Sequence, residues 1–293
     1  MKKQKRAEKR PAVRILRVLA LLLLLTLAEE ALFGNTSLTV TEFTVASPRL
    51  PEAFDGFRVL HLSDLHDARF GKDSEDLIGL ARSLSPDLIV ITGDMIDSKR
   101  TDIGAFLSFA EELNALAPVY CCTGNHEAAL YPAKMEELRQ GLRERKIALL
   151  ENESRYIERG GEHICLIGLK DIGYGKGSVE KRAQALENDL EQLIGGEETF
   201  FLVLTHRPEF AETLSAAGPD LLLGGHAHGG QVRLPLLGGL YAPGQGLLPR
   251  YDAGLYELSG VPLIVSRGLG NSVFPLRVFN RPELVLITLR TAE

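Results

Sequence analysis

Apolar residues recur along the chain in short runs, and most of these runs end in a cluster of polar residues. Five strand-like runs have this form, at 57–62, 88–92, 119–123, 201–204 and 221–223. Helical spacing of apolar positions appears at about 74–84, 102–116, 133–146, 179–194 and 208–216. Alternating strands and helices predict an α/β sheet, in which ligands gather at the carboxyl ends of the strands.

Further strand patterns occur before and after these runs. They lie at 38–45, 147–150, 154–158, 163–168, 254–258, 261–265 and 284–290. Two mixed sheets packed face to face, with helices outside, accommodate this number of strands. We therefore expect a four-layer α/β/β/α sandwich. A stretch rich in Gly and Pro, 229–254, interrupts the strands and carries several leucines among its turns.

The first 17 residues differ sharply in charge from the rest of the chain. They hold eight Lys or Arg and one Glu, a net charge of 8 − 1 = +7. The uncharged run 18–28 follows, and as a helix it spans about 16 Å of the roughly 30 Å hydrocarbon core. A helix over 15–33 reaches about 28 Å but takes in three charged residues. We expect a transmembrane signal-anchor at the cell membrane, with the catalytic domain extracytoplasmic.

Two alternatives to an anchor stay open. One is a signal peptide cleaved after Ala28, which would release a secreted protein. The other is a buried core helix, which the flanking positive charge disfavours. The expected organisation is a basic tail and anchor at 1–34, a lead strand and connector at 35–56, and a catalytic domain at 57–293.

Charge and cysteine content narrow the classes of function. The net charge of the whole chain is −6, so residues 18–293 carry −6 − 7 = −13. Such an acidic body lacks the positive field that nucleic acid binding needs, so no nucleic acid partner is expected. The cysteines are three in number, which argues against a disulfide framework. We expect Cys121, Cys122 and Cys165 to be buried small residues.

The polar clusters contain most of the histidines. Five of the seven lie there, accompanied by three Asp or Asn residues: His66, His126, His206, His226, His228, Asp64, Asp94 and Asn125. Imidazole and carboxylate together suit Mn, Fe, Zn or Co. The members of the pairs Asp64/His66 and His226/His228 are two residues apart, so on an extended strand end both would point to one side.

Neighbouring glycines complete these clusters. Five of them would let the backbone turn sharply after a strand: Gly93, Gly124, Gly225, Gly229 and Gly230. Each motif alone is also explained without a metal site. Asp-x-His arises by chance, Gly-Asn-His is often a turn, and a lone His206 suits a hydrophobic core. The ordered set, with each member after a strand-like run, argues against chance. His61 and His163 lack this context, and we expect structural roles for them.

The ordered set D-x-H, G-D-x-x-D, G-N-H-E, T-H and G-H-x-H-G-G resembles the calcineurin-like metallophosphoesterase superfamily. The resemblance extends from about residue 57 to the C-terminus. It is closest to a bacterial membrane-associated branch, through LPEAFDGFRVLHLSDLH at 50–66, GHAHGGQVRLP at 225–235 and SRGLGNSVFPLRVFNRPELVLITL at 266–289. It implies the metallophosphoesterase fold and a phosphoric ester hydrolase.

The resemblance also implies roles for individual residues. Two divalent ions would be held by seven ligands, the first by Asp64, His66 and His228, the second by Asn125, His206 and His226, with Asp94 bridging. His126 would face the substrate, either as the acid for the leaving oxygen or as a stabiliser of charge on the phosphoryl group. Asp97 and Glu127 match positions from which carboxylates orient imidazole ligands.

Two ions about 3.5–4 Å apart suit phosphoester hydrolysis, because they clamp the phosphate and generate a metal-bound hydroxide near neutral pH. We expect hydrolysis of a phosphodiester or phosphomonoester near the membrane or cell wall, with a lipid-linked substrate considered. A pyrophosphatase cleaving a nucleotide-linked lipid is an alternative. A non-catalytic metal-binding scaffold is an alternative of another class.

Two weaker signals lie outside the motif set. Arg267 and Asn271 would either contact a phosphate or belong to a glycine turn between strands. The stretch 229–254 follows the ligands His226 and His228, so it would rim the site. Its leucines would rest on a bilayer, grip an acyl chain or pack on the protein itself.

Overall fold

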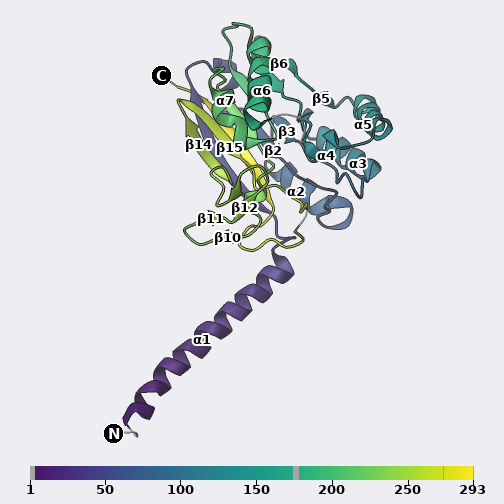
Figure 1. Ribbon diagram of the computed structural model, residues 1–293. Coiled ribbons are helices and arrows are strands. Elements are labelled where there is room, and N and C mark those ends of the chain that lie inside the picture. The colour runs from purple at the N-terminus through teal and green to yellow at the C-terminus, as the bar shows by residue number, and fades with distance from the viewer. Residues whose placement is uncertain (1–3, 174–177, 273, 293) are drawn as a thin grey trace.

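The computed structural model describes residues 4–173, 178–272 and 274–292. It has a compact body and one long helix, α1 (Gln4–Phe33), that projects from one end of the body (Figure 1). The body contains two six-stranded mixed sheets. Both are built mainly from the apolar runs described above.

The first sheet has the strand order β1-β16-β2-β3-β4-β5. Its strands are β1 (Thr39–Ser47), β16 (Glu283–Thr291), β2 (Arg58–Leu62), β3 (Leu88–Thr92), β4 (Val119–Cys122) and β5 (Ala148–Leu150). Only β16 and β2 pair antiparallel. The parallel strands β2, β3 and β4 therefore end at the same edge.

The second sheet has the order β14-β15-β9-β8-β7-β6. Its strands are β14 (Gly254–Leu258), β15 (Val261–Val265), β9 (Leu221–Gly224), β8 (Phe201–Leu204), β7 (Glu162–Gly168) and β6 (Glu153–Arg159). The two outer pairs are antiparallel and the central strands are parallel. The strands β8 and β9 therefore also end side by side.

Three apolar clusters define the layers. One lies between the sheets and joins residues such as Val59 and Leu88 to Leu202 and Leu221. The outer face of the first sheet packs against α2 (Glu75–Ser83), α3 (Ile103–Asn114) and α5 (Pro132–Glu144). The outer face of the second packs against α6 (Val179–Ile194) and α7 (Ala211–Ser215). This is the four-layer order that the strand and helix pattern predicts.

Two parts of the body differ from the sequence-based expectation. The lead strand β1 is not separate from the catalytic domain, because it pairs in parallel with β16 along its whole length and forms an edge of the first sheet. The stretch 229–254 contains two short hairpins. These are β10 (Arg233–Leu234) with β11 (Gly238–Gly239), and β12 (Tyr241–Ala242) with β13 (Gly246–Leu247). The three cysteines are buried and free, as predicted.

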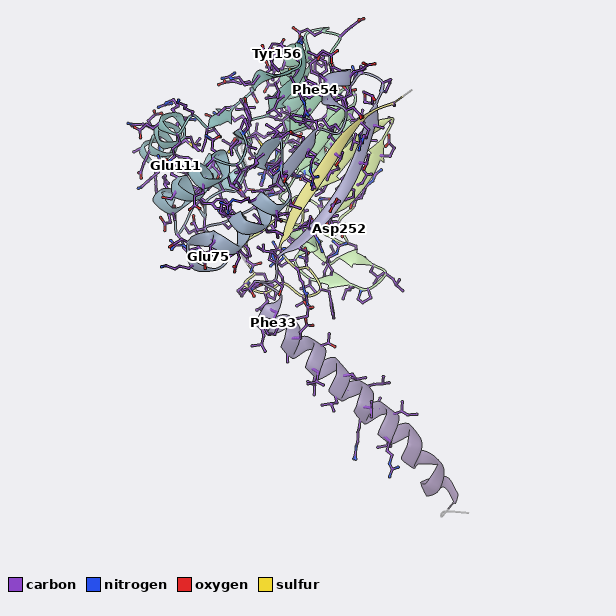
Figure 2. All side chains as sticks on the ribbon, turned by 180° about the vertical axis from the view of Figure 1, so that it is seen from behind. Phe33, Phe54, Glu75, Glu111, Tyr156 and Asp252 are labelled. Carbon is purple, nitrogen blue, oxygen red and sulfur yellow. The ribbon has the colours of Figure 1, made fainter. Side chains whose placement is uncertain are left out.

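The C-terminal end of α1 is bound to the body, and Phe33 marks this junction in Figure 2. Glu29 forms an ion pair with Arg281, and buried Glu30 accepts a hydrogen bond of 2.8 Å from Phe279 N. Within the described part of the chain, no helix is both long and apolar enough to cross a membrane. The signal-anchor therefore stays a prediction.

Candidate metal centre

The seven predicted ligands come from the carboxyl ends of five strands. Asp64 and His66 follow β2, Asp94 follows β3 and Asn125 follows β4 in the first sheet; His206 follows β8, and His226 and His228 follow β9 in the second. β2, β3 and β4 are neighbours in one sheet and β8 and β9 in the other, and side chains from both sets of strand ends meet in the same groups of donor atoms. The site thus bridges the two sheets at one edge.

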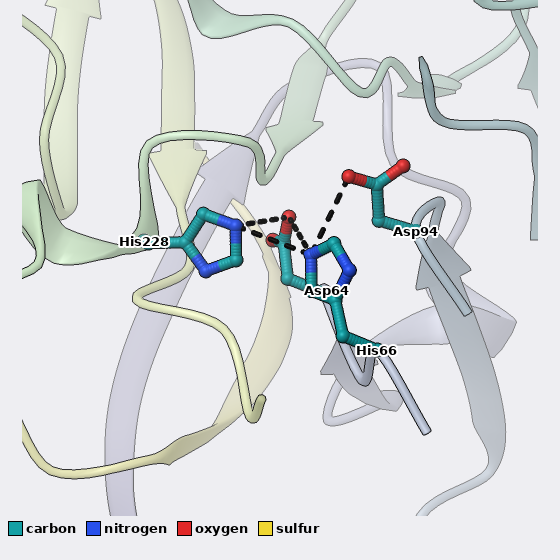
Figure 3. Close-up of side chains that lie close together, drawn as sticks. All are labelled: Asp64, His66, Asp94 and His228. Carbon is teal, nitrogen blue, oxygen red and sulfur yellow. Dashed lines mark hydrogen bonds and ion pairs between the residues drawn. The ribbon is translucent and has the colours of Figure 1, made fainter. Parts of the chain in front are cut away.

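The first group consists of Asp64, His66, Asp94 and His228, all buried (Figure 3). The Nε2 atoms of His66 and His228 lie 3.2 Å apart. Asp64 Oδ1 lies 3.5 Å from His228 Nε2 and 3.9 Å from His66 Nε2. Asp94 Oδ2 completes the group at 3.5 Å from His66 Nε2.

The second group shares Asp94 with the first. Asp94 Oδ2 lies 3.3 Å from His206 Nε2, and His226 places a donor atom within 4.8 Å of both residues. Asn125 Oδ1 lies 3.2 Å from His206 Nε2. One carboxylate thus faces both groups, which is the arrangement that a bridging ligand requires.

These separations fit a divalent cation. Nitrogen and oxygen ligands bind such ions at about 2.0–2.2 Å, which places neighbouring donor atoms about 3–3.5 Å from each other. The pairs at 3.2 to 3.5 Å satisfy this spacing. His206 Nδ1 donates to the carbonyl oxygen of Thr92 at 2.7 Å. That bond leaves Nε2 as the atom able to ligate, as in other metal-binding histidines.

Electrostatics also favour cation binding. Burial lowers the pKa of His66 to about 3, so its ring is in the neutral, ligating form. Burial opposes ionisation of Asp94, but His206 and His66 hold the pKa of Asp94 well below its ordinary value. Burial likewise opposes protonation of His206, but Asp94 raises its pKa to about 10. A cation binding to His206 would take the place of that proton.

The backbone at the ligands is not extended, so the predicted strand-end geometry is wrong. Asp64 and His66 have φ values of 52° and 47°, and Asp94 has 49°. His226 and His228 have 62° and 48°. This left-handed region is uncommon outside glycine, and such strain concentrates at functional sites. Each pair therefore converges through consecutive turns rather than along a straight strand.

The predicted glycines serve two different purposes. Gly93, Gly229 and Gly230 have positive φ, which supports the predicted sharp turns. Gly124 and Gly225 instead allow close approach. A Cβ on Gly225 would lie 1.9 Å from Ser63 Oγ, and one on Gly124 would lie 2.3 Å from Asp94 Oδ1. A side chain at either position would displace a ligand carboxylate or its neighbour.

The two predicted supporting carboxylates contact backbone amides. Glu127 accepts from the N–H groups of Asp94 and Gly124, both at 2.8 Å, and of Ile96 at 3.2 Å. Burial, with Asp94 nearby, raises the pKa of Glu127 to about 7. The expectation that Glu127 orients an imidazole is therefore wrong, since it fixes the turns that carry Asp94 and Asn125.

Asp97 is placed differently from Glu127. Its Oδ1 accepts from the backbone N–H of Lys99 at 2.8 Å and of Arg100 at 3.2 Å. It also offers an oxygen within 4.8 Å of ring nitrogens of His66 and His126. Its position is compatible with the predicted role beside imidazoles.

His126 stands beside the first group without joining it. Its ring packs edge-on against His66, with centroids 4.5 Å apart. Its Nδ1 accepts a hydrogen bond of 3.0 Å from Ser98 N, which assigns the proton of the neutral ring to Nε2. Nε2 lies 3.4 Å from Ser272 Oγ. The ring is therefore set as a hydrogen-bond donor.

A buried ion pair beside His226 was not predicted from the sequence. Arg207 Nε binds Asp171 Oδ2 at 2.7 Å, and Arg207 Nη1 lies 3.4 Å from His226 Nε2. Glu209 Oε1 lies 3.4 Å from the same Nη1. The available signals were the position of Arg207 directly after His206 and that of Asp171 shortly after the strand at 163–168.

The weaker candidates have structural roles. Arg267 binds Glu283 at 2.8 Å, and Asn271 Oδ1 accepts from Gln231 and Arg277. These contacts support the glycine-turn interpretation of this segment. His61 is buried against Thr92 Oγ1 at 2.7 Å.

Comparison with known proteins identifies the family. The sequence profile described as calcineurin-like phosphoesterase matches residues 57–230. The chain belongs to this family. It is a metallophosphoesterase, a phosphoric ester hydrolase of a family that uses divalent metals, and the predicted resemblance is confirmed. The scaffold alternative is thereby set aside.

Several curated relatives match over most of the chain. An uncharacterized metallophosphoesterase, YkuE, of Bacillus subtilis (strain 168) is 30% identical and covers 86% of each chain. The phosphodiesterase YaeI of Escherichia coli (strain K12) is 33% identical over 80% of this chain and 82% of its own. A transmembrane protein with metallophosphoesterase domain from Danio rerio is 30% identical over 94% of this chain and 63% of its own.

Proposed function

We propose that this metallophosphoesterase hydrolyses a phosphodiester through two ions that share Asp94. The observation that carries the proposal is the convergence of seven predicted ligands on two groups of donor atoms with one carboxylate in common. Asp64, His66 and His228 would hold one ion, and Asn125, His206 and His226 the other. When bound, the ions would activate water and neutralise the phosphate charge.

His126 would act as a donor toward the substrate rather than as a general acid. A general acid has to carry a proton on both ring nitrogens, but Nδ1 already accepts from Ser98 N. Neutral His126 would therefore donate its Nε2–H to an oxygen of the phosphoryl group and stabilise the charge there. Of the two roles that the resemblance implies, this one agrees with the hydrogen bond.

A diester is favoured over a monoester by the limited positive charge beside the ligands. The guanidinium of Arg207 is paired with Asp171, and that of Arg277 is bound to the backbone carbonyls of Arg267, Gly270 and Asn280. A monoester carries up to two negative charges and a diester one, so the diester needs less compensation. The name of the E. coli relative, a phosphodiesterase, points the same way.

We also propose that the protein is anchored in the cell membrane by α1, with the two-sheet body, which includes β1, as the catalytic domain outside the cytoplasm. The side chains of α1 between Val13 and Leu25 that the structure describes include many large, exposed apolar groups. The basic segment before them has the charge that retains a helix end in the cytoplasm. Cleavage after Ala28 would fall within the continuous helix, beside the two acids that bind the body.

The chemistry is tested by purified full-length protein with bis-p-nitrophenyl phosphate, p-nitrophenyl phosphate and a nucleotide diphosphate-linked lipid. With Mn²⁺, Fe²⁺, Zn²⁺ or Co²⁺ we expect turnover of the diester to exceed that of the monoester. Preference for the nucleotide-linked lipid would support the pyrophosphatase alternative instead. No turnover with any of these ions would contradict the proposal, and an Asp94→Asn sample controls for contaminating enzymes.

The location is tested separately by fractionating cells and measuring the intact mass of the protein. We expect an uncleaved chain in the membrane fraction. A chain in the medium that begins at Glu29 would support the secreted alternative.

A further inference from the structure

Exposed apolar side chains gather at the end of the body from which α1 emerges. Six of them form what we call the apolar rim: Leu236, Leu237, Leu247, Leu248, Phe274 and Phe279. Leu236 is fully exposed, and Leu247 and Leu237 are 74% and 66% exposed. Soluble proteins rarely display such clusters, which usually mark an interaction surface.

Two of these leucines have strained backbone conformations in or beside the hairpins. Leu236 lies at the turn between β10 and β11, and Leu248 directly follows β13. Their φ values are 68° and 52°, a conformation that is unfavourable for leucine. Strained backbone that presents an apolar side chain to water is retained where the side chain has a use.

Hydrogen bonds join the parts of the apolar rim to one another and to α1. Arg233 N, at the base of the first hairpin, donates to Val278 O at 2.9 Å. Phe279 N donates to Glu30 at 2.8 Å, at the end of α1. Leu236 and Phe279 also line one groove of 430 Å³. The hairpins, the segment around Phe279 and the end of α1 therefore form one connected surface.

The exposed side chains of α1 identify the partner. Val13, Ile15, Leu16, Val18, Leu19, Leu21, Leu22, Leu24 and Leu25 are all exposed. At 100° per residue these positions point to every side of the helix. A groove on a second protein covers one face of a helix, whereas lipid surrounds all faces. Residues 1–17, with a net charge of 8 − 1 = +7, would also be attracted to anionic lipid headgroups.

We propose that the apolar rim inserts into the surface of the same lipid bilayer that receives α1. Figures 1 and 2 show α1 leaving the body at the end that carries the small hairpins, so both reach one plane. The apolar rim begins shortly after the ligand His228 in the chain. Between them, Gln231 donates to the carbonyl oxygens of Phe274 and Leu276, which ties the metal centre to the rim. The mouth of the metal centre would thus lie next to the membrane surface, where a phosphate ester with an apolar tail is accessible.

The inference rests on the proposed membrane location and not on the proposed chemistry. The chain contains no tryptophan, so single tryptophans can report on depth without background. Full-length Leu247→Trp would be placed in vesicles of phosphatidylcholine and phosphatidylglycerol with ordinary or brominated acyl chains. Tyr131→Trp, at a position 83% exposed before α5, is the matched control.

We expect the Leu247→Trp protein to emit at shorter wavelength on the vesicles and to lose about half its fluorescence to brominated lipid, while Tyr131→Trp is unchanged. Protein that floats with the vesicles without this quenching would overturn the docking and leave α1 attachment intact. Protein that does not float would overturn both. A shift without vesicles that grows with protein concentration would also overturn it, because a second copy would then cover the rim.

A second pair of variants tests insertion of the rim as a unit. Adding Leu236→Asp to Leu247→Trp places a charge in the bilayer surface, so quenching should fall to less than about half of its former extent. Adding Tyr131→Asp to Leu247→Trp should leave quenching unchanged. Equal quenching in both would contradict the proposal. Turnover of bis-p-nitrophenyl phosphate should be the same in both variants, which verifies folding.

Discussion

The two halves of the candidate centre are supported in different ways. In the half with Asn125, His206 and His226, the ring of His206 is held by a hydrogen bond from Nδ1 to Thr92 O. In the half with Asp64, His66 and His228, the Nδ1 atoms of both histidines are buried without a hydrogen-bond partner among the described residues. The ring of His206 is therefore oriented by a hydrogen bond, whereas the rings of His66 and His228 are held by packing, and hydrogen bonds in their half go to Asp64. We expect the His206 half to bind its ion more tightly.

The largest effect should come from the residue that both halves share. Replacing Asp94 by Ala removes an oxygen from each ion and leaves two positive charges without their common carboxylate. We expect loss of both ions and a fall in kcat of about 10³-fold or more. Elemental analysis and diesterase kinetics would measure this. Asp55→Ala, at an exposed carboxylate paired with Arg290, is the control and should retain both ions.

Single removals should distinguish the halves. His66→Ala should lose one ion and keep the other with nearly unchanged affinity, because the His206 half is oriented independently. His206→Ala should retain less than one ion per chain, since the Nδ1 atoms of His66 and His228 in the remaining half have no hydrogen-bond partner among the described residues. Both should lower kcat about 10²- to 10³-fold. Titration with Mn²⁺ monitored by calorimetry would reveal the asymmetry, and equal occupancy in the two variants would contradict it.

His126→Ala should separate chemistry from metal binding. Both ions should stay, because the ring lies outside both groups of ligands, while kcat should fall about 10²-fold. If the ring donates to the phosphoryl oxygen, the fall is similar for p-nitrophenyl and alkyl leaving groups. A loss confined to poor leaving groups would instead assign His126 as the general acid.

Glu127→Gln should have the smallest effect of the set. A glutamine side chain presents N–H groups where backbone N–H groups of Asp94 and Gly124 now donate, so the turn should loosen. We expect metal affinity to fall about tenfold, at the lower end of effects from supporting residues. Glu137→Gln, at an exposed ion pair on α5, is the matched control. Unchanged affinity would show that the turn holds without Glu127.

Much of the fold and of the centre follows from local sequence patterns. The helices at 103–114, 132–144 and 179–194 agree with their predicted spans to within two residues, because their apolar spacing is regular and each has one buried face. The candidate ligands were predictable because each lies two to four residues after a buried strand, and the family resemblance implied which ion each would hold. Parallel neighbouring strands then bring residues from five places in the chain together.

Other features depend on contacts between distant segments and have no local signal. The pairing of β1 with β16 joins the two ends of the body. The Arg207–Asp171 ion pair joins residues 36 positions apart. The left-handed backbone at Asp64 and His66 is imposed by the site as a whole, since nothing in Asp-x-His predicts it. The helix α4 (Asn125–Ala128) is too short for periodicity to reveal it.

The most direct test of the shared carboxylate is anomalous diffraction from crystals of the protein grown with Mn²⁺. The account predicts two anomalous peaks about 3.5–4 Å apart, one on each side of the Asp94 carboxylate, with His66 and His228 at one and His206 and His226 at the other. In crystals grown at decreasing Mn²⁺ concentrations, the peak in the His206 half should persist to a lower concentration than the other peak. A single peak, or two peaks that do not share Asp94, would contradict the account.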